Sequence, residues 1–89
     1  MRRAARTDAS QVEIVKALRK IGAAVYVIGL PLDLLVAFRK RTMLIECKVD
    51  GGTYTKQQVE FMEAWPGEVH TVRTPEEAVA AVIGKEAMK

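Results

Sequence analysis

The sequence contains one cysteine and one histidine, and both shortages narrow the chemistry open to the chain. A single cysteine cannot form an internal disulfide or supply a cysteine-rich zinc site. A single histidine argues against a metal cluster built on histidines and against a relay of two histidines. We therefore expect an intracellular protein whose chemistry, if it has any, rests on carboxylates and lysine.

Long hydrophobic runs are also missing. No stretch approaches the roughly 20 apolar residues that span a bilayer, and the segment MRRAARTDAS lacks the apolar centre of a signal peptide. We expect no membrane partner. The 89 residues are 49% hydrophobic and 28% charged, which is the composition of one ordinary folded domain with residues 1–7 as a basic arm. A domain this small buries only a modest part of its surface, so dimerisation would add stability.

The charge balance is basic, with a formal net charge of +3 at pH 7. This permits nucleic-acid binding without establishing it, because an ordinary solvated surface has a similar composition. The distribution says more than the total, since basic residues gather in two parts of the chain. These residues are Arg2, Arg3, Arg6, Lys16, Arg19 and Lys20 in the first part, and Arg39, Lys40 and Arg41 in the second.

Hydrophobic periodicity and capping signals predict an α/β fold with the order α-β-β-β-α-β-α. The predicted helices cover about 9–21, 56–65 and 75–83, and the predicted strands cover 23–28, 32–38, 43–49 and 68–73. Hairpin strands followed by a helical crossover into a fourth strand give a mixed four-stranded sheet flanked by helices. Phe61 and Trp65 lie on the apolar side of the second predicted helix, and we expect them to belong to the core rather than to serve as base-stacking platforms.

Two apolar strands, joined by the basic turn Arg39-Lys40-Arg41-Thr42, stand at the centre of the chain. Side chains alternate across a strand, so Glu46 and Lys48 project from one face and Cys47 from the other. Asp33 opens the first of the two strands, and a hairpin would bring it close to Glu46 and Lys48. Charged groups in an apolar strand are costly unless they are paired, metal-bound or at an exposed end.

These charges have two interpretations. Asp33 could simply bond a turn amide, and Glu46 with Lys48 could be a simple ion pair. We favour a shared ligand set, because i and i+2 neighbours on a strand do not have ideal pairing geometry. In this interpretation Asp33, Glu46 and the backbone carbonyl of Cys47 hold Mg²⁺ or Mn²⁺, and Lys48 orients a water or stabilises a phosphate transition state.

Glu13 also has two interpretations. It stands three residues after Ser10, which is the spacing of a capping box, and Asp8 with Gln11 offers the same signal. Glu13 could therefore be the acid of the first helix cap or an outer ligand of the metal or water. Gln58, early in the second helix, is weak evidence alone, because a helical glutamine is usually just solvated.

Taken together and in order, these segments resemble the PD-(D/E)xK nuclease superfamily. The segments are Gly29…Pro31-Leu32-Asp33-Leu34-Leu35-Val36, then Leu44-Ile45-Glu46-Cys47-Lys48, then Thr55-Lys56-Gln57-Gln58. Within the superfamily the chain looks like the small stand-alone virus-type replication-repair nuclease domains of phages and bacteria. The resemblance covers residues 8–83, with one departure, since Leu32 stands between Pro31 and Asp33.

The resemblance implies a restriction-endonuclease-like core and an active site of Asp33, Glu46, Lys48, Gln58 and Glu13. Either Gln57 or Gln58 could be the glutamine of the motif. Gln58 fits the motif better, because it lies three residues, about one helical turn, after Thr55. It also implies a Mg²⁺- or Mn²⁺-dependent DNA endonuclease, similar to Holliday-junction resolvases that act as homodimers, in the cytoplasm of a bacterium or a phage-infected host. The first and last helices are the candidate dimer interfaces. The basic residues named above would contact phosphates without reading bases.

Two other functions stay open at this point. The chain could be a nuclease for flaps, nicked duplex or other branched DNA. It could also be a catalytically silent nucleic-acid-binding or assembly module that keeps the fold. The complete set of two acids and a lysine argues against silence, because a scaffold does not need Glu46 and Lys48 in an apolar strand.

Overall fold

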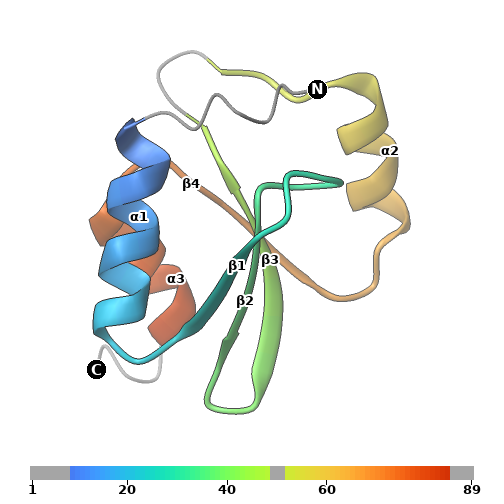
Figure 1. The fold of residues 1–89 in the computed structure, drawn as a ribbon. Helices are drawn as coiled ribbons and strands as arrows, with labels where there is room; N and C mark the ends of the chain where they lie inside the picture. The colour runs from blue at the N-terminus through green and yellow to red at the C-terminus, as the bar shows by residue number, and fades with distance from the viewer. Residues whose placement is uncertain (1–8, 49–51, 85–89) are drawn as a thin grey trace.

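The fold is that of a computed structural model in which residues 9–48 and 52–84 are described, so the expected basic arm at 1–7 lies outside them. The elements, in chain order, are α1 (Ala9–Lys20), β1 (Ala24–Val27), β2 (Leu34–Phe38), β3 (Arg41–Cys47), α2 (Lys56–Ala64), β4 (Glu68–Val72) and α3 (Pro75–Ile83). The predicted order α-β-β-β-α-β-α is confirmed (Figure 1). No helix in the described part of the chain is long and apolar enough to cross a membrane.

The four strands form one mixed sheet in the order β1-β2-β3-β4. The first three strands are antiparallel neighbours, and β4 is parallel to β3. The parallel pair requires a crossover, which the segment containing α2 provides. The expected mixed four-stranded sheet is thus confirmed, with β1 and β4 at its edges.

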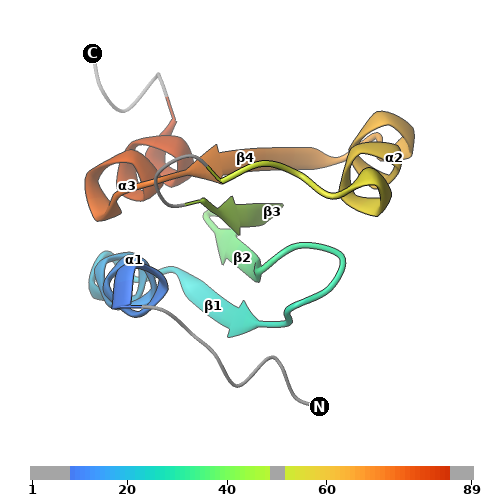
Figure 2. The ribbon, with the colours of Figure 1, turned by 90° about the horizontal axis from the view of Figure 1, so that it is seen from above.

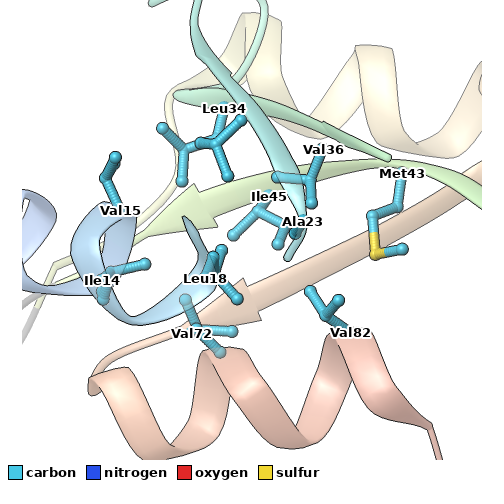
Figure 3. Packing of buried hydrophobic residues seen from close by; sticks show 12 residues of the cluster. Ile14, Val15, Leu18, Ala23, Leu34, Val36, Met43, Ile45, Val72 and Val82 are labelled. Atoms are coloured by element: carbon cyan, nitrogen blue, oxygen red, sulfur yellow. The ribbon is translucent and has the colours of Figure 1, made fainter. Parts of the chain in front are cut away.

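The helices lie on opposite sides of this sheet. Helices α1 and α3 pack against each other on one side, while α2 lies on the other (Figures 1 and 2). The hydrophobic core fills the space between the sheet and the α1–α3 pair (Figure 3). Its members include Ile14, Leu18, Val25, Leu34, Val36, Met43, Ile45, Val72, Ala78 and Val82. Apolar residues from α1, from α3 and from alternate strand positions therefore build a single core.

Helix α2 contributes no buried residue, so the expectation that its aromatics join the core is wrong. Phe61 and Trp65 stack on each other with ring centroids 5.2 Å apart, and Trp65 remains 44% exposed. An apolar groove of about 380 Å³ separates these rings from Leu35 and Leu44 of the sheet. The helix is therefore held beside the sheet mainly by its N-terminal end, where the candidate site lies.

The β2–β3 hairpin has a two-residue turn rather than the four-residue basic turn expected from the sequence. Arg39 and Lys40 have positive φ values of 53° and 70°, and Phe38 pairs directly with Arg41. Two consecutive residues with positive φ give the turn the backbone twist that matches paired strands. Arg41 and Thr42 therefore belong to β3, so their side chains project from opposite faces of the sheet.

Candidate active site

The candidate site lies where β2 begins and β3 ends, on the sheet face that carries α2. Leu34, the first residue of β2, pairs with Ile45, and both side chains are in the core on the α1–α3 side. Because side chains alternate, the adjacent Asp33 and Glu46 project from the other face. The predicted hairpin thus brings the two carboxylates together at one end of the sheet.

Glu46 is the only charged residue that is buried in the described part of the chain, at 4% exposure. Three N–H donors satisfy its carboxylate. The Asp33 backbone N–H donates to Oε1 at 3.2 Å, and Gln58 Nε2 and Lys48 Nζ reach Oε2 at 3.0 and 3.1 Å. A buried carboxylate without such partners would be strongly destabilising, so these donors offset the cost of burying the Glu46 side chain.

Asp33, which directly precedes β2, is bonded to the end of β3 and to the residues that follow β1. Its Oδ2 accepts a hydrogen bond from the Cys47 backbone N–H at 2.8 Å, and its backbone carbonyl accepts from Ile28 and Gly29. Asp33 therefore bonds the neighbouring strand as well as its own loop. Cys47 packs against the core on the opposite face, as the alternation predicts.

Lys48 has an exposed side-chain fraction of only 13%. Its ammonium pairs with Glu46, donates to the Thr53 carbonyl at 2.8 Å, and lies 5.0 Å from the centre of the Tyr54 ring. The ion pair between Glu46 and Lys48, which is the less favoured of the two sequence interpretations, is therefore present. A metal-ligand role for Glu46 remains a proposal.

Gln58 connects α2 to the strands through both ends of its amide. Its Oε1 accepts from the Thr55 backbone N–H at 3.2 Å, and the Thr55 hydroxyl accepts from the Gln58 backbone N–H, which completes a capping box. Its Nε2 donates to Glu46 and, at 3.4 Å, to the Pro31 carbonyl. Gln57 is exposed. The geometry therefore selects Gln58, and not Gln57, as the glutamine that contacts Glu46.

Glu13 is not joined to this cluster by a hydrogen bond or ion pair among the described residues. It lies on α1, on the other side of the sheet, with a side chain that is 60% exposed and pairs with Lys16 at 3.8 Å. The Ser10–Glu13 capping box is wrong, because α1 begins at Ala9 and Ser10 lies inside its first turn. The alternative cap, Asp8, lies outside the described residues, and an outer-ligand role for Glu13 stays a prediction.

The predicted phosphate contacts divide into three groups. Arg2, Arg3 and Arg6 lie outside the described residues. Lys16 and Lys20 on α1 are exposed, as are Arg39 and Lys40 at the hairpin tip. The guanidinium groups of Arg19 and Arg41 bond other residues of the chain. Arg19 donates to the Val25 carbonyl at 2.9 Å, and Arg41 forms a larger cluster.

Arg41 forms that cluster with Glu68 and His70 at the opposite end of β3. Its guanidinium pairs with both carboxylate oxygens of Glu68 and donates to the Val82 carbonyl at 2.6 Å, near the end of α3. His70 Nε2 lies 2.6 Å from Glu68 Oε2. The hydrogen bonds from Arg41 and then from His70 lower the pKa of Glu68 to about 2. This cluster ties β3, β4 and α3 together.

Glu68 should therefore make stability depend on pH in the acid range. Its pKa is lower in the folded chain than the ordinary 4.5, so its contribution is complete above about pH 4.5 and is lost as the pH falls toward 2. Over this interval we expect the free energy of unfolding of the unaltered chain to fall by about 1–2 kcal/mol more than that of Glu68→Gln. This figure allows for the screening of a partly exposed ion pair by solvent. Urea unfolding of both proteins at pH 5, 4 and 3 measures the difference, and parallel curves would contradict the prediction.

Sequence reasoning missed Tyr54 and the Arg41–Glu68–His70 cluster. Tyr54 lies in the segment before α2, where no periodicity marks a contact. Burial and then the charge of Glu46 raise its pKa, while Arg73 opposes them, so its hydroxyl stays neutral at neutral pH. The cluster depends on the parallel pairing of β3 with β4, which the sequence pattern does not specify.

The donor set fits a hard cation in its chemistry. The described residues contain no group of three or more histidine, cysteine, aspartate or glutamate side chains that could hold a metal ion. The candidate set has two carboxylates, Asp33 and Glu46, with the Cys47 backbone carbonyl as a third oxygen donor. Mg²⁺ usually keeps several waters and binds through one or two carboxylates, so two acids are a sufficient protein contribution.

Comparison of the chain with protein-family models, with curated proteins and with solved structures finds no match. The function of the chain is therefore inferred from the site and from the resemblance of its ordered residues to the PD-(D/E)xK pattern.

Proposed function

We propose that the chain is a metal-dependent DNA endonuclease, and specifically a Holliday-junction resolvase that acts as a homodimer. The observation that carries the proposal is the convergence of Asp33, Lys48 and Gln58 on the buried carboxylate of Glu46. The same ordered residues carry the resemblance to PD-(D/E)xK nucleases. Two acids, an ammonium and an amide at the end of a sheet are suited to phosphodiester hydrolysis.

Each residue has a distinct role in this proposal. Asp33, Glu46 and the Cys47 carbonyl would hold Mg²⁺ or Mn²⁺, which lowers the pKa of bound water and neutralises charge on the phosphate. Lys48 would orient the attacking water or donate to a phosphate oxygen. The oxygen of that water bonds to phosphorus and gives up a proton to solvent, while the phosphorus–oxygen bond to the leaving group breaks and the leaving oxygen takes a proton from solvent. Gln58 keeps Glu46 oriented. The contacts of the Lys48 ammonium with Glu46 and with the Thr53 carbonyl support this role, because they restrain the ammonium beside the two acids.

DNA binding is supported by the net charge of +3 and by exposed cations outside the site. The exposed basic residues are Lys16, Lys20, Arg39 and Lys40. Such contacts to phosphates are sequence-independent and weaken as salt increases. Symmetric cutting of a four-way junction needs two active sites, and a two-fold dimer of this chain would supply them. Junction affinity that does not change with salt would contradict the DNA-binding part of the proposal.

The experiment is cleavage of an end-labelled four-way junction and of a matched linear duplex, each with Mg²⁺, Mn²⁺ or EDTA. Lys48→Ala tests the site, and Lys56→Ala is the matched control, because Lys56 is exposed at the start of α2. We expect paired, metal-dependent nicks in the junction from the chain and from Lys56→Ala, and none from Lys48→Ala. Equal cutting of flaps and junctions would favour a nuclease for branched DNA in general.

A catalytically silent binding module is the second candidate. The buried Glu46 carboxylate already has three N–H partners, so the cluster is satisfied without a metal. A satisfied polar cluster of this kind can be purely structural. Junction binding without cleavage under either metal would favour this candidate over the nuclease.

The two neighbouring glutamines offer a matched test of the geometry. Gln58→Ala removes a donor to Glu46 and one half of the α2 capping box, whereas Gln57→Ala removes an exposed side chain. We expect Gln58→Ala to lose about 1–2 kcal/mol of stability and roughly tenfold or more of the cleavage rate. Gln57→Ala should match the unaltered chain in both measurements. Equal effects of the two substitutions would contradict the assignment of Gln58.

A further inference from the structure

The Lys48 ammonium has a third neighbour besides the two oxygen acceptors already described. The ring of Tyr54 lies with its centre 5.0 Å from Lys48 Nζ, within the distance at which a cation is attracted to an aromatic face. The Lys48 side chain is 13% exposed, so solvent screens this attraction less than it would at the surface. Tyr54 therefore restricts where the ammonium can lie.

The position of Tyr54 in the chain strengthens this contact. Thr53, whose carbonyl accepts from Lys48, and Thr55, whose hydroxyl caps α2, are its two neighbours. The backbone on both sides of Tyr54 is thus fixed by hydrogen bonds, one to Lys48 and one to Gln58. These bonds restrain the backbone position from which the Tyr54 ring reaches the ammonium.

The donor inventory of Lys48 shows why its orientation matters. An ammonium carries three N–H donors, and Glu46 with the Thr53 carbonyl takes two of them among the described residues. No described residue accepts from the third, which can therefore donate to a water or a phosphate oxygen. A four-carbon lysine stem has many rotamers, so the ring on one side limits the directions in which that third donor can point.

We propose that Tyr54 is a positioning residue whose aromatic face holds the Lys48 ammonium in place for the phosphodiester substrate. This inference rests on the proposed nuclease function. It assigns the effect to the ring and not to the hydroxyl, because a cation is attracted to the π-face. Phenylalanine at position 54 should therefore preserve the positioning of Lys48, whereas leucine, which has no aromatic ring, should lose it.

The test compares Tyr54→Phe with Tyr54→Leu in junction cleavage, with kcat and KM determined separately. We expect Tyr54→Phe to stay within about twofold of the unaltered chain, and Tyr54→Leu to lose about tenfold in kcat with KM unchanged. A second measurement does not need activity: the NMR signal of the Lys48 ε-methylene group should be displaced upfield by the ring. That displacement should persist in Tyr54→Phe and vanish in Tyr54→Leu.

The outcomes separate the inference from the function on which it rests. Tyr54→Leu cleaving as fast as the unaltered chain would overturn the inference and leave the nuclease standing. Tyr54→Phe falling as far as Tyr54→Leu would also overturn it, because the hydroxyl would then be responsible. An unaltered chain that cuts no DNA would overturn the proposed function together with the role of Tyr54. In that case a displaced Lys48 signal would show that only the structural contact survives.

Discussion

Replacing Glu46 by glutamine should abolish metal-dependent cleavage and also weaken the fold. Glu46 has three side-chain contacts with the residues that the structure describes, and all three come from donors: the Asp33 N–H on one oxygen, and Lys48 and Gln58 on the other. A glutamine amide has one oxygen and one NH₂ group, so in either orientation a donor faces a donor. We expect a loss of about 2–3 kcal/mol in the free energy of unfolding and of at least about 10³-fold in cleavage.

The matched control is Glu60→Gln, because Glu60 is an exposed glutamate on α2. It removes the same charge and should change neither quantity appreciably. Cleavage is measured at a temperature where circular dichroism shows Glu46→Gln to be folded, so that lost activity reports the site and not unfolding. Cleavage within tenfold of the unaltered chain would show that Glu46 is not part of the catalytic centre.

The core of the candidate site could be predicted because it depends on local rules. Strand alternation places Glu46 and Lys48 on one face, and a hairpin brings Asp33 to them. The three-residue offset from Thr55 selects Gln58, and the structure contains that capping box. These inferences need only the period of a strand, the geometry of a short hairpin and the spacing of a helix cap.

The parts that could not be predicted depend on non-local packing. Phe61 and Trp65 have the spacing of a core-facing helix side, yet α2 is held by hydrogen bonds at its N-terminal end and leaves Trp65 exposed. In the sequence, Arg41 has the position of one of three cations in a basic turn. Only the two-residue turn and the parallel pairing of Met43 with Glu68 show that Arg41 lies in β3, where its guanidinium can bond Glu68 and the end of α3.

Arg41 and Lys40 are adjacent cations with opposite expected roles, and this gives the second large prediction. Arg41→Met keeps much of the apolar stem but removes the paired contact with Glu68 and the donors to the end of α3. We expect it to lose about 2 kcal/mol in the free energy of unfolding, which lowers the melting temperature by roughly 10 °C for a domain of this size. Lys40→Met removes an exposed cation and should leave the melting temperature unchanged.

DNA binding should show the reverse pattern. If the proposed DNA binding holds, Lys40→Met should reduce the salt dependence of junction affinity by about one counterion, because it removes one proposed phosphate contact. Arg41→Met should leave that slope unchanged at temperatures where it is folded, because its guanidinium already binds Glu68 and α3. Thermal melts and titrations at three salt concentrations, on both variants, measure the two effects together. If Arg41→Met lowered the salt slope and spared the melting temperature, Arg41 would be a DNA contact and its cluster with Glu68 would contribute little to stability.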